Sequence, residues 1–528
     1  MAKRYQVIVA GGGPTGLALA VQLGLRGISC IVVESRASGH RIPKGQYLTH
    51  RSAEHFYFWG IVGKLRAARV MPQGYPIGEI TAYDNLMHEF WHMQKGRDVI
   101  RDYYFQGNER LPQYQTEAVL RDRAASLPGV EVRLGWSVKA VEQDDAGVRV
   151  AIANEGNGAT EVLESDYAVG CDGSRSVVRE QIGIPRDVTE FEQLMVLAVL
   201  RSRELHEGLK RFPEGAMFRV MHPAAQGYWK FFGRVDVGEG FFFHAPVPPD
   251  TTRDNFDFLG LMHETAGFKF ACELDHIGFW EMRVAVAEKY QVGRAFIAGD
   301  AAHSHPPYGG FGLNSSLEDA ANLGWKLAAK LQGWGSDALL ASYSEERRPI
   351  FHEIAEDFIA RRIRNDADFY IRHNPNRDRA EFEQAWNARH TDLADRAMVY
   401  EPGYEGSPVV IAPPGGRTTA HGQHTFKARS GHHLPPQVLS SGRNVFEELG
   451  PGFTLLAFGV ADGATGAFED AAKSRSMPFK VVRDSYEEPR TKYESRMMLV
   501  RPDQYVAWTG NAAPDNAGAI VRKVSGWN

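Results

Sequence analysis

A run of glycines near the start of the chain has the spacing of a phosphate-binding turn. In Gly11–Gly16, glycines stand at the first, third and sixth positions of a G-x-G-x-x-G pattern, which permits close backbone approach to a pyrophosphate. Alone the match is weak, because glycine supplies 54 of the 528 residues. Its context is more specific: strand patterns at 5–10 and 29–34 flank helical apolar spacing at 14–26, and Glu34 ends the second strand, where it can accept ribose hydroxyls. This order predicts a dinucleotide site.

A second glycine-rich segment also follows an expected strand. The strand pattern at 294–298 ends at Gly299-Asp300, and glycines keep the next loop, up to Asn314, free of side chains where a flat ring could lie. Asp300 could accept sugar or ribityl hydroxyls. The helix expected at 315–332 would direct its positive end at such a ring and stabilise negative charge there.

Two histidines and a third motif are further candidates for binding a metal or a phosphate. His303 and His305 suggest a metal, but no acidic or cysteine partners cluster with them in the sequence, so we expect loop or core histidines and no metal. In the third motif, 171–179, Asp172-Gly173 predicts a turn after a strand. Arg175 and Arg179, four residues apart, could face a phosphate together.

The composition excludes several classes of protein. Hydrophobic residues make up 43%, charged residues 24%, and the net charge of -5 argues against a nucleic-acid partner. Cys30, Cys171 and Cys272 lie too far apart for a disulfide framework or a cysteine-rich zinc site, which favours a reducing cytoplasm. No apolar run of about 18 residues and no signal peptide is evident, so we expect a cytoplasmic protein without a membrane partner.

The length predicts about three domains. A parallel α/β domain should comprise 1–184 and 287–345, interrupted at 185–286 by an antiparallel sheet with aromatic strands. A helical connector is expected at 346–400. A glycine- and proline-rich loop then opens a small α/β domain at 401–528.

Together the three motifs resemble those of the single-component FAD-dependent aromatic hydroxylases, the group that contains para-hydroxybenzoate and phenol hydroxylases. The resemblance covers about residues 5–350 and is most specific at GGGPTG, CDGSRSVVR and GDAAHSHPPYGGFGLN. It implies the para-hydroxybenzoate hydroxylase fold: a Rossmann-like FAD-binding domain with an inserted antiparallel-sheet substrate domain.

The C-terminal part is similar to the thioredoxin-like domain of the phenol hydroxylase branch. Because no cysteine follows Cys272, this domain cannot perform dithiol chemistry, and a structural or oligomerisation role is expected. The family resemblance also implies a homodimer.

The resemblance assigns cofactor contacts residue by residue. FAD is expected at Gly11, Gly13, Pro14, Thr15, Gly16, Glu34, Arg36, Arg41, Lys44, Gln113, Asp172, Gly299, Asp300, Pro307, Gly310, Gly312, Leu313 and Asn314. There is no second strand-bound G-x-G-x-x-G, so NADPH or NADH should bind transiently over the flavin, without a Rossmann domain of its own.

The implied activity is hydroxylation of a phenol by O2. NAD(P)H reduces FAD, oxygen forms a C4a-hydroperoxide, and this attacks the ring of a small aromatic substrate beside its hydroxyl group. The peroxide requires a water-excluding pocket. Its candidate walls are Phe218, Tyr228, Phe231, Phe232 and Phe243, although half or more of these could simply fill the core. Candidate catalytic residues are Arg283, Tyr290 and His50, which could favour phenolate, and Pro307.

Three other functions are compatible with a flavoprotein-like fold. A flavin-dependent halogenase is disfavoured because its Trp-x-Trp-x-Ile-Pro signature is absent, and a dithiol reductase because Cys-x-x-Cys is absent. The third alternative is a binding or prenyl-escort module that has this fold but no catalytic activity. The sequence does not choose among simple, nitro- or carboxylated phenols and larger polyketides as substrate.

Overall fold

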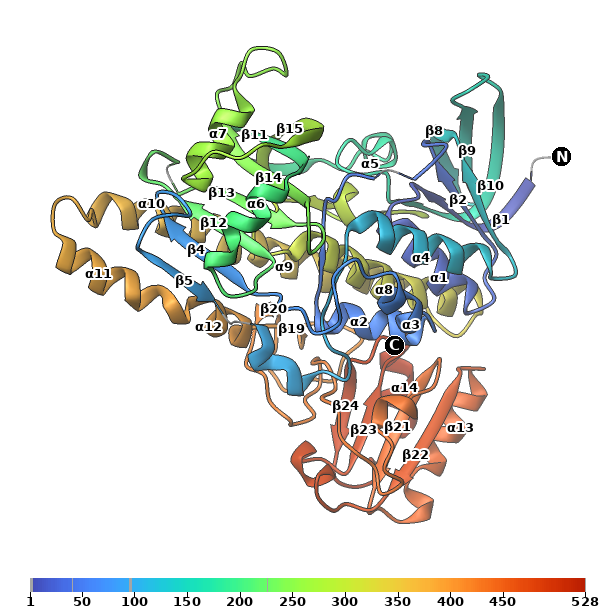
Figure 1. The fold of residues 1–528 in the computed structure, drawn as a ribbon. Helices are drawn as coiled ribbons and strands as arrows, with labels where there is room; N and C mark the ends of the chain where they lie inside the picture. Colours follow the sequence, from blue (N-terminus) through green and yellow to red (C-terminus); the bar gives the residue numbers. More distant parts are fainter. Residues whose placement is uncertain (1–2, 40, 95–96, 226, 528) are drawn as a thin grey trace.

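The computed structural model describes residues 3–39, 41–94, 97–225 and 227–527. Two large sheets lie side by side, helices lie beside and between them, and a smaller domain projects from the side that carries the first sheet (Figure 1).

The first sheet carries the glycine turn. In the described part of the chain it has eight strands, with β16-β17-β10-β1-β2-β7 in order and a β8–β9 hairpin attached to β10. Its strands are β1 (Lys3–Ala10), β2 (Cys30–Glu34), β7 (Val130–Leu134), β8 (Trp136–Asp144), β9 (Gly147–Asn154), β10 (Thr160–Gly170), β16 (Gln291–Val292) and β17 (Ala295–Ile297). Because β1 pairs in parallel with both β2 and β10, the ends of these strands meet at one edge of the sheet.

Helices cover this sheet and bury its apolar strands. The helices of this part are α1 (Pro14–Gly24), α2 (His50–Phe58), α3 (Val62–Ala67), α4 (Gln113–Ala125), α5 (Val177–Gln181) and α8 (Phe311–Leu331). α1 packs against α4 and α8, and its leucines share one hydrophobic core with β1 and β2. A short β3 (Tyr47–Leu48) pairs with β6 (Glu109–Arg110).

The second sheet is larger than the 185–286 segment predicted for it. Among the described residues its eight strands follow the order β18-β15-β11-β14-β13-β12-β4-β5. They are β4 (Glu79–Tyr83), β5 (Trp91–Gln94), β11 (Arg186–Arg201), β12 (Met217–Met221), β13 (Trp229–Arg234), β14 (Gly240–Val247), β15 (Glu273–Ala287) and β18 (His303–Ser304). β4 joins in parallel with β12, so 79–94, placed in the first domain from the sequence, belongs to this sheet. Short helices α6 (Arg203–Gly208) and α7 (Phe258–Ala266) accompany it.

The helical connector lies beside the second sheet (Figure 1). It comprises α9 (Asp337–Glu353), α10 (Arg361–Arg372), α11 (Arg379–Asn387) and α12 (Asp392–Val399), followed by the hairpin of β19 (Tyr400–Tyr404) and β20 (Thr418–His421). Between α9 and α10 the chain forms a π-helical stretch, Ile354–Ala360. Pro349 lies shortly before it, inside α9, and proline removes a helical hydrogen-bond donor.

The C-terminal domain is built on a mixed four-stranded sheet among the described residues. Its strands run β22-β21-β23-β24, with β21 and β22 parallel and the other pairings antiparallel. Its elements are β21 (Phe453–Phe458), α13 (Gly466–Ser474), β22 (Phe479–Asp484), β23 (Met497–Val500), β24 (Val506–Gly510) and α14 (Ala517–Val524). Trp325 of α8 packs in the same core as Phe453, so this domain is bound to the first domain by apolar contact.

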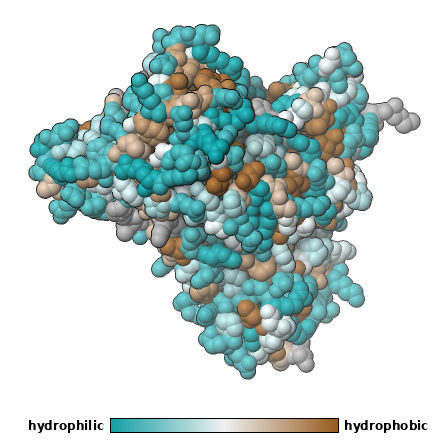
Figure 2. All heavy atoms as spheres, viewed as in Figure 1, coloured by the Kyte–Doolittle hydropathy of each residue, from teal (hydrophilic) through white to brown (hydrophobic). Residues whose placement is uncertain are grey.

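The face shown in Figure 2 is mostly hydrophilic, with hydrophobic side chains in small separate groups. Within the described ranges, no helix has both the length and the apolar character needed to cross a membrane.

Candidate functional site

The turn between β1 and α1 requires its glycines for two different reasons. Gly11 has a φ of +101°, and a Cβ there would overlap the carbonyl group of Cys171, while a Cβ on Gly16 would overlap the carbonyl oxygen of Gly11. At Gly13, by contrast, no atom of the described residues lies within 4 Å of the place that a Cβ would take. The backbone is therefore closely packed at Gly11 and Gly16 and open at Gly13, the position where a pyrophosphate would approach.

The end of β2 places a carboxylate beside this turn. Gly12 donates its backbone N–H to Glu34 Oε2 at 2.7 Å, and the Arg36 backbone N–H and Nε donate to Oε1 at 2.9 and 2.8 Å. Burial alone would raise the pKa of Glu34, but these hydrogen bonds lower it below its ordinary value. Glu34 is thus held ionised, with lone pairs left for ribose hydroxyls.

The second glycine motif meets the first in space. Gly299, with a φ of +62°, donates to Asp319 Oδ2 at 3.0 Å and leaves no room for a Cβ beside Thr15. Asp300 follows with an exposed side chain; surrounding protein raises its pKa, while His303 and Lys44 oppose that rise. An acceptor for sugar or ribityl hydroxyls therefore stands near the β1–α1 turn.

The third motif, 171–179, packs beside the β1–α1 turn. Its Arg179 bonds to the protein backbone and does not face a phosphate site. Asp172 Oδ2 accepts the N–H of Val178, in the first turn of α5, at 3.1 Å, while burial raises the pKa of the carboxyl. Arg179 is buried and donates to the backbone carbonyl oxygens of Ala301 and Ser174 at 3.1 and 3.2 Å. The Arg179 guanidinium therefore ties α5 to the Gly299 loop.

The start of α8 offers free backbone donors. Gly309 and Gly310 adopt φ values of +76° and +68°, and Gly310 caps this 21-residue helix without a side-chain hydrogen bond from any described residue. Gly312 and Leu313 lie in the first turn. The positive end of the helix dipole and its unpaired N–H groups can stabilise negative charge on a ring placed here.

The Asn314 side chain, at a position expected to contact FAD, makes four hydrogen bonds within the protein. Its Oδ1 accepts from the Thr49 N–H at 2.8 Å and Ser52 Oγ at 2.6 Å, and its Nδ2 donates to Tyr47 O at 2.9 Å and Gly310 O at 2.7 Å. All four positions of the amide are used. The Asn314 side chain therefore fixes the Tyr47–Ser52 segment on α8.

Four other predicted contacts lie in or beside two loops. Gln113 Oε1 accepts the Gly45 N–H at 3.2 Å and its Nε2 donates to Glu117 at 2.9 Å, which holds the loop bearing the exposed Arg41 and Lys44. Arg41, with Ile42 and Pro43, lines a cleft towards the 235–241 edge of the second sheet. Pro307 is exposed in the loop before α8.

These features fit FAD. The open Gly13, the ionised Glu34, the exposed Asp300 and the uncapped α8 match, in order, a pyrophosphate, a ribose, a ribityl chain and a ring that carries negative charge.

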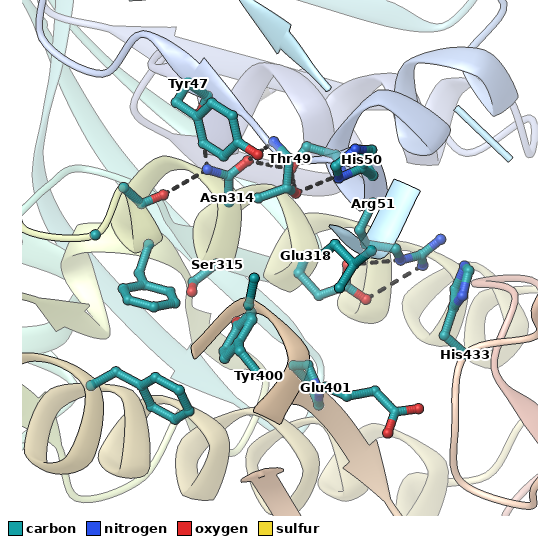
Figure 3. Close-up of a pocket in the computed structure, with 18 of the residues that line it drawn as sticks. Tyr47, Thr49, His50, Arg51, Asn314, Ser315, Glu318, Tyr400, Glu401 and His433 are labelled. Carbon is teal, nitrogen blue, oxygen red and sulfur yellow. Dashed lines mark hydrogen bonds and ion pairs between the residues drawn. The ribbon is translucent and has the colours of Figure 1, made fainter. Parts of the chain in front are cut away.

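A cavity adjoins the start of α8 (Figure 3). It is lined from widely separated segments by Tyr47, Thr49, His50, Arg51, Ser52, Ile100, Tyr104, Gly309, Gly310, Phe311, Asn314, Ser315, Glu318, Arg347, Phe358, Arg362, Arg396, Ala397, Tyr400, Glu401, Pro402, His433 and Tyr505. The last two belong to the C-terminal part of the chain. That domain therefore contributes part of the wall.

At one end of the cavity, arginine, glutamate and histidine side chains contact one another. Arg51 pairs with Glu318 and Glu54 at 3.2 Å each, and Glu318 also contacts His55 Nε2 at 2.7 Å. His433 contacts Glu54 at 2.7 Å. Burial alone would raise the pKa of Glu318, but Arg51 and His55 hold it well below its usual value. We call Arg51, Glu54, His55, Glu318 and His433 the paired cluster.

Of the predicted catalytic side chains, His50 lines the cavity, and the structure places two others elsewhere. Arg283 points away from the apolar face formed by its neighbours Met282 and Val284, because side chains alternate along β15, and it approaches Arg179. Tyr290 is fully buried between His303 and Tyr343 in the first domain. Neither residue can act on a ligand in this cavity from these positions.

The same alternation separates the aromatic candidates of the second sheet. Phe218, Phe232 and Phe243 pack in a core on one face, whereas Phe231 and Tyr228 pack in the core that also contains Phe311 and Phe358 of the cavity wall. More than half of the aromatic candidates therefore fill a core away from the cavity.

Sequence reasoning missed several residues of the wall. Tyr47, Arg362, Arg396, Tyr400, Glu401, His433 and Tyr505 were not predicted. They belong to no short motif, and only the tertiary packing of the connector and the C-terminal domain brings them to α8.

Comparison with known proteins agrees with the fold and the site. A family model described as "FAD binding domain" matches residues 4–357, and one described as "Aromatic-ring hydroxylase, C-terminal" matches residues 427–527. The chain belongs to the FAD-dependent aromatic-ring hydroxylases, a family of flavoprotein monooxygenases.

Individual relatives cover nearly the whole chain. FAD-dependent monooxygenase apdD of Emericella nidulans is 28% identical over 99% of this chain and 90% of its own length. Tetracenomycin B2 monooxygenase-dioxygenase of Streptomyces olivaceus is 28% identical over 98% of this chain and 97% of its own. The solved structure of the rebeccamycin biosynthetic enzyme RebC with reduced flavin is 28% identical, covers 100% of both chains and superposes with a TM-score of 0.85.

Proposed function

We propose that this protein hydroxylates a phenolic aromatic substrate, with FAD as bound cofactor and NAD(P)H and O2 as co-substrates. The observation that carries this proposal is the cavity that opens at the Gly309-Gly310 start of α8 and is walled by Phe311, Phe358 and Tyr400. The relative named for tetracenomycin B2 supports an aromatic substrate.

Some residues would bind the cofactor, and others would exclude water from the reaction. The β1–α1 turn, Glu34 and Asp300 hold the nucleotide and ribityl parts, and the α8 N-terminus stabilises negative charge on the ring. FAD, when bound, supplies the electron transfer and oxygen activation. The aromatic wall excludes water from the reacting centre.

His50 is our remaining candidate for a side chain that favours the phenolate. It is 1% exposed, lies in the cavity wall and stacks on Tyr104 with ring centroids 5.7 Å apart. A neutral imidazole there could accept a phenol proton. NAD(P)H binding without a domain of its own, a homodimer and a cytoplasmic location stay predictions.

The test uses the purified holoenzyme. We expect a yellow protein that oxidises NADPH or NADH with oxygen uptake, faster when an aromatic substrate from a panel of phenols and polycyclic phenols is added. Mass spectrometry should then find a product with one added oxygen atom. A colourless preparation that takes up no added FAD would contradict the proposal, and so would NAD(P)H oxidation that no aromatic compound accelerates.

A further inference from the structure

The wall of the cavity contains a buried cation whose hydrogen-bonding capacity is unused. Arg362 of α10 lines the cavity, and its side chain is 11% exposed. Within the described residues it donates no hydrogen bond, and its Nε is buried without an acceptor. A guanidinium carries five N–H donors, and buried donors in proteins are nearly always satisfied.

The carboxylate closest to Arg362, that of Asp366, already accepts hydrogen bonds from other residues. Asp366 Oδ2 lies 4.0 Å from Arg362 Nε, beyond hydrogen-bond distance, and accepts from Trp229 Nε1 at 2.9 Å. The other oxygen, Oδ1, accepts from Arg389. Asp366 therefore lowers the electrostatic cost of a charge at Arg362 without using its donors.

Other cations surround this position. Arg219 and Arg362 both lie over the ring of Trp229, with their Cζ atoms 4.1 and 4.0 Å from its centroid. Arg396 of α12 lines the same part of the cavity and, with Arg219, lowers the pKa of Arg362 together with the larger effect of burial. An anion in the cavity would relieve both the repulsion and the missing hydrogen bonds.

The helix geometry around Arg362 places its side chain in the cavity wall. The π-helical stretch ends just before α10, and Phe358 and Arg362, four residues apart, both reach the cavity. The same wall contains Phe311 and the Gly309-Gly310 turn, so a ligand bound to Arg362 extends towards the α8 N-terminus.

We propose that Arg362, assisted by Arg396, binds a carboxylate carried by the aromatic substrate and so fixes which end of that substrate faces the α8 N-terminus. A planar guanidinium and a carboxylate match in geometry and charge. This inference rests on the proposed function, since it takes the occupant of the cavity to be the aromatic substrate.

The test compares two flat probes that differ in charge, anthraquinone-2-carboxylate and anthraquinone-2-carboxamide, binding to the FAD-loaded protein by calorimetry. The wild type should bind the acid about 10- to 100-fold more tightly than the amide, the usual worth of hydrogen bonds to a charged group. Arg362→Gln should abolish this preference, and Arg362→Lys should keep part of it. The matched control is Arg364→Gln, on the exposed side of the same helix, which should keep all of it.

Equal affinity of the wild type for both probes, or no binding of the acid at millimolar concentration, would overturn the proposal without any variant. A preference that persists in Arg362→Gln would overturn it as well. A thermal melt separates binding from a structural role: removing a buried cation that donates no hydrogen bond should not lower the melting temperature of the ligand-free protein.

Two further measurements distinguish failure of this proposal from failure of the proposed function. FAD content and aromatic-dependent NAD(P)H oxidation are measured on the same samples. A protein that hydroxylates aromatic compounds but shows no preference for the acid disproves the carboxylate site alone, whereas a protein that takes up no FAD disproves the hydroxylase.

Discussion

The β1–α1 turn and the cavity differ in how the chain builds them. The turn occupies Gly11–Gly16 and presents backbone N–H groups, so its chemistry depends on the absence of side chains. The cavity draws side chains from Tyr47 to Tyr505 and depends on buried charges. A local backbone device tolerates change in the rest of the protein, whereas a site built from distant charges is sensitive to every element that carries one.

The first effect concerns cofactor binding and is expected at the turn itself. Gly13→Ala should leave the melting temperature unchanged, because Gly13 has a φ of −73° and free space around it. FAD affinity should fall at least about tenfold, which is about 1.4 kcal/mol, since the new methyl group lies where the pyrophosphate approaches. Calorimetric FAD titration measures this.

Gly11→Ala is the matched contrast. Its φ of +101° and the carbonyl group of Cys171 oppose a side chain, so this variant should lose folding stability as well as FAD. If Gly13→Ala bound FAD as tightly as the wild type, the turn would not be the pyrophosphate site.

The next effect concerns the buried charges behind the cavity. Glu346 accepts from Lys326 at 2.7 Å and from Arg501 at 2.7 and 2.9 Å, and all three side chains are fully buried. Glu346→Gln leaves two buried cations under-compensated and should cost about 3–5 kcal/mol of unfolding free energy. Urea denaturation measures this loss.

Its control is Glu142→Gln, which removes an exposed pair with Arg149 at 3.5 Å. That change should stay within about 1 kcal/mol. Equal costs at the two sites would show that the interdomain charges do not stabilise the fold.

A smaller effect should depend on pH. Arg51 and His55 hold the pKa of Glu318 well below its ordinary 4.5, so the carboxylate stabilises the fold fully above that pH and less as pH falls, because the unfolded chain takes up the proton first. The wild type should therefore exceed Glu318→Gln by about 2 kcal/mol at neutral pH. This difference should shrink below about pH 4.5. A difference that stayed constant down to acid pH would argue against an ionised Glu318.

The smallest effect is expected at Tyr290. Its hydroxyl is buried without a hydrogen-bond partner among the described residues, and it lies outside the cavity. Tyr290→Phe should change stability by no more than about 0.5 kcal/mol and the hydroxylation rate by no more than about twofold. A large loss of rate would restore Tyr290 as a catalytic candidate.

Much of the fold follows from local patterns. The strands and the helix around the glycine turn, the aromatic strands at 217–221 and 240–244, and the small C-terminal domain all form where their periodicity predicts. Each pattern is satisfied within one element or between neighbours in the chain. β4 and β5 were missed because nothing in 79–94 specifies its pairing with β12, more than 120 residues later.

Where a dinucleotide could bind follows from the sequence alone, because the glycine turn and Glu34 lie within one βαβ unit whose geometry is local. The resemblance of the three motifs to those of the FAD-dependent aromatic hydroxylases also indicated the chemistry. Which side chains face the cavity, in contrast, depends on the tertiary structure. Strand alternation turned Arg283 away, packing buried Tyr290, and the fold of the connector left Arg362 in the wall with its donors unused. Such outcomes depend on contacts between segments far apart in the chain, which no short pattern records.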